Sequence, residues 1–206
     1  MSNIVVPETT EAPAFKSAHF IGIGGAGMSG IALVLHERGY AVSGSDLKTS
    51  RYIRQLTRAG VDIHIGHEAK TIDEVKPEVV VVSTAIPETN PELGIPVWPR
   101  AKMLSALGQG YTTIAVAGTH GKTTTSSMCA TMLDRMDLDP SFLIGGIVEG
   151  YDTNGRNGSG EFFVAEADES DSSFLYLNPN VVVVTNVEAD HMDHYSSLEE
   201  IEETFC

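Results

Sequence analysis

The segment Gly118-Thr119-His120-Gly121-Lys122-Thr123-Thr124 decides the fold class, because it joins an apolar run at 111–117 to a helix-like stretch at 123–137. A glycine-rich loop between a buried strand and a helix points backbone N–H groups and the helix N-terminus at phosphate groups. Lys122 can reach the β and γ oxygens of a nucleoside triphosphate, and the Thr123 hydroxyl can bind Mg²⁺. We therefore predict that the residues of this loop bind ATP and Mg²⁺: Gly118, Thr119, His120, Gly121, Lys122, Thr123 and Thr124.

The amino-acid sequence of this loop departs from the commonest phosphate-loop pattern, GxxxxGK[ST]. The position six residues before Lys122 is Val116, and the first glycine of the loop is Gly118. A glycine turn with an exposed lysine is the alternative interpretation. The strand before the loop and the helix after it favour phosphate binding, because structural context confirms such a motif better than its spelling does.

Short β-branched runs alternate with amphipathic stretches from Ala18 onward, a pattern typical of βαβ units and a parallel sheet. We predict an α/β fold, with a Rossmann-like parallel-sheet N-terminal domain followed by an incomplete P-loop-type α/β central domain. Glycines at 39 and 60 occupy positions where left-handed helix C-caps are expected. The expected strands are 18–23, 40–43, 61–65, 78–84, 111–117, 141–144, 161–165 and 180–185, and the expected helices are 28–38, 52–59, 100–107 and 123–137.

Loops separate these elements at two places. Four prolines in 85–99 predict a loop or short linker, and a glycine-rich polar stretch predicts another loop at 145–160. We place a flexible N-terminus at 1–17, a Rossmann-like domain at 18–108 and a partial central domain at 109–206. The last residues, 198–205, have the pattern of an amphipathic helix without a cap, so the second domain is expected to be unfinished.

The net charge and the composition limit the kinds of partner and the compartment that we expect for this chain. The formal net charge of −15 argues against nucleic acid, which needs a basic patch, but not against a nucleotide held by local N–H groups and Mg²⁺. The uncharged stretch 20–35 is too short to span a membrane, and 1–13 lacks the features of a signal peptide. Two cysteines, Cys129 and Cys206, make no disulfide framework, so we expect a cytoplasmic protein.

A second glycine loop, Gly22-Ile23-Gly24-Gly25-Ala26-Gly27, matches GxGxxG after an apolar strand, and Asp46 ends the next strand. This is the Rossmann fingerprint, in which glycines admit a diphosphate and the acid binds ribose hydroxyls. The glycines do not distinguish NAD, FAD and a UDP-sugar. A purely structural turn that packs a helix on a strand is the other interpretation.

Acids and histidines follow two further strands. Glu166 ends a strand and begins an acidic run that continues to Asp171, so it is placed to hold Mg²⁺ beside the ATP phosphates. A solvated acidic loop is the alternative. His191 and His194 follow the strand at 180–185, where one of them can bind a metal or contact the transferred phosphoryl group, although isolated histidines are more often structural or exposed.

Together these motifs resemble the Mur ligase family, which joins amino acids to UDP-muramoyl precursors of peptidoglycan. The matching pieces are HFIGIGGAGMSGIA at 19–32, SGSD at 43–46, AGTHGKTTT at 117–125, AEADESDSSF at 165–174 and VTNVEADHMDHY at 184–195. Within the family, the Gly-Gly-Ala-Gly-Met loop and TNVEADHMD are most similar to the branch that adds L-alanine.

The resemblance implies that the first loop binds a UDP-sugar and not NAD. Thr123 and Glu166 are implied to bind one Mg²⁺, and His191 a second Mg²⁺ near the substrate carboxylate. Lys122, Glu166 and His191 form the implied catalytic group. The residues implied to contact UDP-N-acetylmuramate are Gly24, Gly25, Ala26, Gly27, Met28, Ser45, Asp46, Ser83, Thr84 and Ala85.

The implied reaction phosphorylates the lactyl carboxylate of UDP-N-acetylmuramate with ATP, after which the amine of L-alanine displaces phosphate. The resemblance also implies a longer central domain and a third, amino-acid-binding domain, so we expect this chain to be a fragment that does not ligate alone. It further implies a few more residues between 90–92 and 95–97 than this sequence has.

Two rival functions stay open at this stage. A nicotinamide-dependent oxidoreductase explains the loop at 22–27 and Asp46, but it leaves the loop at 118–124 without a purpose. A non-enzymatic P-loop switch or scaffold explains the second loop only.

Overall fold

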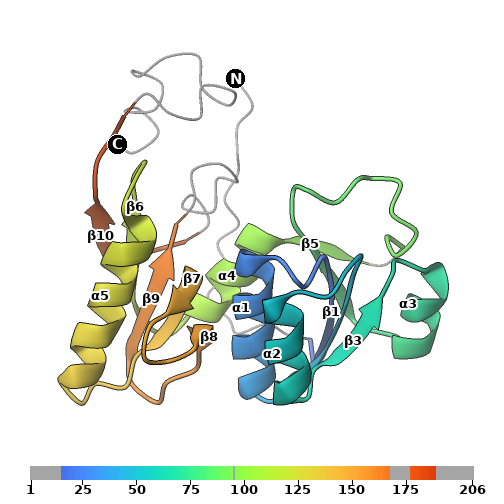
Figure 1. The fold of residues 1–206 in the computed structure, drawn as a ribbon, viewed down its shortest axis with the longest axis horizontal. Coiled ribbons are helices and arrows are strands. Elements are labelled where there is room, and N and C mark those ends of the chain that lie inside the picture. Colours follow the sequence, from blue (N-terminus) through green and yellow to red (C-terminus); the bar gives the residue numbers. More distant parts are fainter. Residues whose placement is uncertain (1–14, 95, 168–176, 189–206) are drawn as a thin grey trace.

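The computed structural model describes residues 15–94, 96–167 and 177–188, which form two five-stranded sheets with helices around them (Figure 1). The α/β fold class is thereby confirmed. The expected helix at 198–205 lies outside the described residues, as does the N-terminus up to residue 14. In the described part of the chain no helix is both long and apolar enough to cross a membrane.

The first sheet is entirely parallel and has the strand order β3-β2-β1-β4-β5. This is the order of the nucleotide-binding Rossmann half, in which β1 and β4 are neighbours although the chain runs outward from β1 first. Its strands are β1 (Ser17–Ile21), β2 (Ala41–Asp46), β3 (Asp62–Ile65), β4 (Val79–Val82) and β5 (Val97–Pro99), connected by α1 (Ala26–Glu37), α2 (Arg51–Ala59) and α3 (Ala69–Val75).

The second sheet has the order β10-β6-β9-β7-β8, with only β8 antiparallel to its neighbour. The helix α4 (Arg100–Gly108) leads from the first sheet into the second, and the helix after the loop at 118–124 follows the first strand of the second sheet in chain order. The remaining elements are β6 (Thr112–Ala117), α5 (Lys122–Arg135), β7 (Ser141–Val148), β8 (Thr153–Arg156), β9 (Phe162–Glu166) and β10 (Val181–Val184).

Opposite faces of the second sheet are covered by different helices. Phe142 and Ile144 cluster with Ala130 of α5, whereas Leu143 between them belongs to the core cluster that contains Ile31 of α1. Since successive side chains of a strand point to opposite faces, α1 and α5 must lie on opposite sides of β7. Figure 1 agrees, with α5 on the outer side of the second sheet and α1 between the two sheets.

The position of α1 between the sheets explains its composition. All eight residues from 28 to 35 are buried, which suits a helix that is apolar all round. Close packing against β8 is possible because two glycines face each other, and a Cβ on Gly155 would lie 2.6 Å from the Gly30 carbonyl oxygen. The side-chain amide of Asn154 also donates to the Ala26 carbonyl and lies 3.1 Å from Ser29 Oγ.

Most expected elements are confirmed, including positive φ at Gly39 and Gly60 after their helices. The prediction of a loop at 145–160 is wrong, because β7 extends to Val148 and the chain then returns as the strand β8. Asn154 and Gly155 are residue types depleted in strands, and the packing of this segment on α1 overrides their local propensity. The prediction of a loop at 85–99 is wrong for its last three residues, which form β5. Because β5 is an edge strand, it tolerates Pro99.

Candidate functional site

The loops after β1 and β4, the end of β2 and the first turn of α1 line a cavity of about 370 Å³ at the carboxyl end of the first sheet, which we call the crevice. In α/β sheets, ligands bind at such a point, where the chain reverses the direction in which it adds strands. Seven of the ten residues expected to contact the UDP-sugar line this cavity: Gly25, Gly27, Met28, Asp46, Ser83, Thr84 and Ala85. The structure thus brings together three segments that are far apart in the sequence.

Asp46 holds the glycine loop in place as well as lining the cavity. Its Oδ2 atom accepts a hydrogen bond of 2.9 Å from the backbone N–H of Gly24. A Cβ at Gly24 would lie 2.8 Å from the same oxygen, so only glycine fits there without displacing the carboxylate. One oxygen of Asp46 therefore holds the glycine loop, and the other, Oδ1, accepts a 3.3 Å hydrogen bond from the Lys48 N–H.

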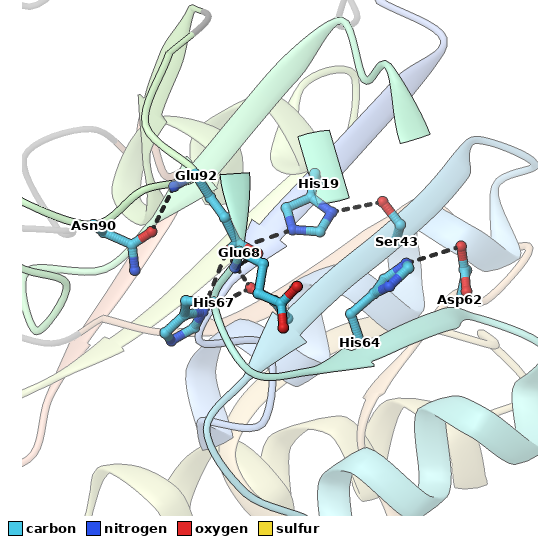
Figure 2. A network of polar contacts seen from close by, with 9 residues as sticks. His19, Ser43, Asp62, His64, His67, Glu68, Asn90 and Glu92 are labelled. Atoms are coloured by element: carbon cyan, nitrogen blue, oxygen red, sulfur yellow. Dashed lines mark hydrogen bonds and ion pairs between the residues drawn. The ribbon is translucent and has the colours of Figure 1, made fainter. Parts of the chain in front are cut away.

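Ser45 lies beneath the crevice and is fully buried. Its hydroxyl donates a 2.5 Å hydrogen bond to Glu92 Oε2, and His67 Nδ1 lies 3.1 Å from the same oxygen. Figure 2 shows Glu92 reaching from its loop between His67 and His19, whose Nε2 is 3.9 Å from Oε2. These contacts tie the end of β2, which carries Asp46, to the segment that contains Glu92.

Glu92 itself is only 1% exposed, yet its pKa is lowered. Burial raises the pKa of this carboxyl, but the contacts with His19 and Ser45 and the N–H of Glu68 together lower it more. The ionised carboxylate is the form that the surrounding groups favour. An ionised Glu92 therefore ties the 90–92 segment to the middle of β1, the end of β2 and the loop after β3.

The phosphate loop lies between β6 and α5, as the sequence predicts. Gly118 has φ of +118° and Gly121, which precedes the first helical residue, has φ of +81°, so both positions favour glycine. Lys122 Nζ folds back over the loop and donates to the carbonyl oxygens of Gly118 at 2.6 Å and Thr119 at 3.2 Å. This ammonium group is within the loop that would surround a triphosphate.

Thr123 and Glu166 converge beside this loop. Thr123 Oγ1 donates to Glu166 Oε1 at 3.1 Å, and the Gly145 N–H donates to Glu166 Oε2 at 2.8 Å. A hydroxyl and a carboxylate are ligands that Mg²⁺ accepts, and this ion is usually held by one or two carboxylates together with substrate phosphates. The donors present therefore fit Mg²⁺, although the described residues contain no cluster of three or more acidic, histidine or cysteine side chains.

A second cavity, of about 250 Å³, lies between α1 and the second sheet. Thr123, Gly145 and Glu166 form one wall, and Ala26 at the start of α1 is on another. Gly27 and Arg100 line both this cavity and the crevice of the first sheet. The predicted Mg²⁺ ligands and the predicted UDP-sugar residues thus face adjoining cavities.

Sequence reasoning missed several residues that line these cavities or support the loops beside them. The side-chain oxygen of Asn186 accepts from the His120 N–H at 2.9 Å, and its backbone oxygen accepts from Thr119 N at 3.1 Å. A Thr-Asn pair directly after a parallel strand was the available signal for this role. No sequence pattern indicates the positions of Glu92, Arg100 and Gly145, because these positions depend on packing. His191 and the acidic residues 168–171 lie outside the described residues.

Comparison with known families settles the relationship. The model of the Mur ligase family catalytic domain matches residues 17–112, and that of the Mur ligase middle domain matches residues 116–206. The chain belongs to the Mur ligase family. Within this family it is 53% identical over 197 residues to a UDP-N-acetylmuramate–L-alanine ligase of Pelobacter propionicus and 54% identical over 194 residues to that of Rubrobacter xylanophilus.

These alignments cover 92% and 91% of this chain but only 42% and 43% of the two relatives, so the chain spans about two fifths of their length. Solved Mur ligase structures share its fold. UDP-N-acetylmuramate:L-alanyl-gamma-D-glutamyl-meso-diaminopimelate ligase from Neisseria meningitides has a TM-score of 0.85 and 36% identity, covering 93% of this chain and 67% of its own. UDP-N-acetylmuramate–alanine ligase from Thermotoga maritima has a TM-score of 0.83 and 32% identity, with coverages of 92% and 46%.

Proposed function

We propose that this chain supplies the UDP-sugar and ATP sites of a ligase that joins L-alanine to the carboxylate of UDP-N-acetylmuramate through an acyl phosphate. The names of its relatives, at 53% and 54% identity, support this substrate pair. The reaction would serve peptidoglycan synthesis in the cytoplasm, and through it cell shape and cell division.

The observation that carries the proposal is the junction of the two cavities. A crevice that contains Asp46 and the first glycine loop adjoins a cavity that contains Thr123 and Glu166, and Gly27 forms part of both walls. A substrate with a diphosphate at one end and a reacting carboxylate at the other needs such an arrangement. A nicotinamide enzyme would have no use for the second cavity or for the phosphate loop beside it.

The roles of individual residues follow from their positions. Lys122 would exchange the carbonyls of Gly118 and Thr119 for phosphate oxygens of ATP, which present the same kind of acceptor with greater negative charge. Thr123 and Glu166 would hold Mg²⁺, and we assign His191 to a second Mg²⁺. Bound Mg²⁺ would neutralise charge on the phosphates, and the protein would supply positioning and electrostatic stabilisation.

The substrate assignment of the remaining loop residues is part of the same proposal. Gly24 and Ser45 would act through the shape of the loop and the strand end, since they do not line the crevice. Ala26 lines the second cavity, and the seven residues that line the crevice would contact the uridine, diphosphate and sugar directly. Their backbone N–H groups at the start of α1 provide the positive end of a helix for the diphosphate.

A chimaera tests the activity. The 206 residues would replace the matching part of the Pelobacter propionicus ligase, and phosphate release would be measured with each reactant omitted in turn. We expect release only when ATP, Mg²⁺, UDP-N-acetylmuramate and L-alanine are all present, and none with Lys122→Ala. Release that does not depend on L-alanine would exclude the assignment.

A further inference from the structure

Arg100 occupies the junction between the two cavities. It is the first residue of α4, directly after β5, and β5 pairs in parallel with β4 so that Pro99 lies opposite Val82. The side chain of Arg100 therefore starts at the same sheet edge as the 83–85 segment. It lines both the crevice of the first sheet and the cavity beside Thr123.

The guanidinium group of Arg100 lies against the first turn of α1. A Cβ built on Gly27 would be 2.5 Å from Arg100 Nη1 and 3.3 Å from Cζ, so a side chain at position 27 would displace the guanidinium. The glycine at 27 thus gives the arginine access to the N-terminus of α1. That end of a helix is where backbone N–H groups attract anions.

The charges around the junction indicate that Arg100 is the group able to attract an anion there. Among the described residues that line the two cavities, Arg100 alone carries a positive charge, while Asp46 lies in one and Glu166 in the other. The chain as a whole has a formal charge of −15. A dianionic diphosphate in the crevice would meet unfavourable carboxylates unless a cation were close to it.

We propose that Arg100 binds the diphosphate of the UDP-sugar and thereby fixes where the sugar passes from the crevice to the cavity of Thr123 and Glu166. The planar fork of an arginine can donate two hydrogen bonds to a phosphate while the N–H groups of α1 bind its other oxygens. This inference rests on the proposed function, since it presupposes a uridine diphosphate in the crevice. It makes Arg100 a substrate-binding residue that no motif in the sequence indicates.

The test compares ligands that differ only in the diphosphate. Binding of UDP to the 206-residue chain is measured by calorimetry, and binding of uridine by ligand-observed NMR. We expect Arg100→Gln to weaken UDP binding at least about tenfold and to leave uridine binding unchanged. Arg100→Lys should retain part of the affinity, because lysine supplies the charge without the fork.

Arg54→Gln is the matched control, since Arg54 is an exposed arginine on α2 that lines neither cavity. It should bind UDP as the wild type does. Unchanged uridine binding by Arg100→Gln also shows that the crevice is still formed in that variant. The UDP affinity of Arg100→Gln should in addition fall less steeply with salt than that of the wild type.

Two results would overturn the inference and are distinguishable from each other. In the first result, the wild type binds UDP, and Arg100→Gln either binds UDP equally tightly or shows equal losses of affinity for UDP and for uridine. The role assigned to Arg100 is then wrong, and the proposed function stands. If the wild type binds neither UDP nor uridine, the proposed function fails, and the inference about Arg100 fails with it.

Discussion

Thr123 at the start of α5 and Glu166 at the end of β9 are 43 positions apart in the sequence, and their side-chain oxygens are 3.1 Å apart in the structure. Parallel pairing of β6 with β9 causes this approach, because Val116 near the phosphate loop lies opposite Glu166 itself. The hydroxyl and the carboxylate are therefore positioned by the sheet and not by the loop alone. This relationship is the basis of the predicted Mg²⁺ site.

Replacement of the Glu166 carboxylate tests that site. We expect Glu166→Gln to remove most of the Mg²⁺ dependence of ATP binding, lowering the affinity for ATP with Mg²⁺ about tenfold or more. Binding is measured by calorimetry with Mg²⁺ and with EDTA. The control is Glu161→Gln, which changes an exposed residue immediately before β9. An unchanged Mg²⁺ dependence in Glu166→Gln would show that another residue holds the ion.

Removal of the Lys122 ammonium group tests the phosphate loop. Lys122→Ala should weaken ATP binding about tenfold or more, because charge-assisted hydrogen bonds to phosphate are lost. Lys48→Ala, which removes an exposed lysine next to the first sheet, should bind ATP normally. Equal ATP affinities in the wild type and Lys122→Ala would argue for a glycine turn that does not bind phosphate.

The close packing of α1 on β8 predicts a strong effect of a single methyl group. Gly155→Ala places a Cβ 2.6 Å from the Gly30 oxygen. It should lower the free energy of unfolding, measured by urea denaturation, by about 1–3 kcal/mol. Gly94→Ala adds the same group in open space at an exposed position and should change it little. Similar unfolding energies for both variants would mean that α1 and β8 do not pack as described.

The buried carboxylate of Glu92 predicts a pH dependence of stability. Its pKa is lowered in the folded protein, so ionised Glu92 stabilises the fold above the ordinary carboxyl pKa and this stabilisation is lost as the pH falls through the folded value. Glu92→Gln should lower the free energy of unfolding at pH 7 by about 1–3 kcal/mol.

The difference between wild type and Glu92→Gln should shrink as the pH is lowered toward 3, and urea unfolding at a series of pH values measures it. Glu88→Gln, an exposed neighbour on the same segment, should show neither effect. A constant difference across the series would mean that the charge of Glu92 contributes nothing to stability.

The phosphate loop at 118–124 and the glycine loop at 22–27 could be predicted from the sequence, because each is a local motif between a strand and a helix. Asp46 and Glu166 could be placed for a related reason, since both end parallel strands whose carboxyl ends share an edge. These elements need only short-range pattern and the rules of parallel sheets.

The rest depends on packing that no local pattern encodes. The strand at 153–156 forms because Asn154 and Gly155 fit against α1, which lies more than a hundred residues earlier. Arg100 is placed at the junction of the cavities by the pairing of β5 with β4 and by the space at Gly27. Glu92 was missed because its partners come from β1, β2 and the loop after β3.

Competition between UDP-N-acetylmuramate and NADH tests the central claim most directly, since both could occupy the crevice beside Asp46. The wild-type chain is titrated with UDP-N-acetylmuramate by calorimetry, alone and in the presence of NADH, and the titration is repeated with Asp46→Ala. We predict one-to-one binding of UDP-N-acetylmuramate that NADH does not reduce and that Asp46→Ala weakens. Binding of NADH without any binding of UDP-N-acetylmuramate would contradict the account.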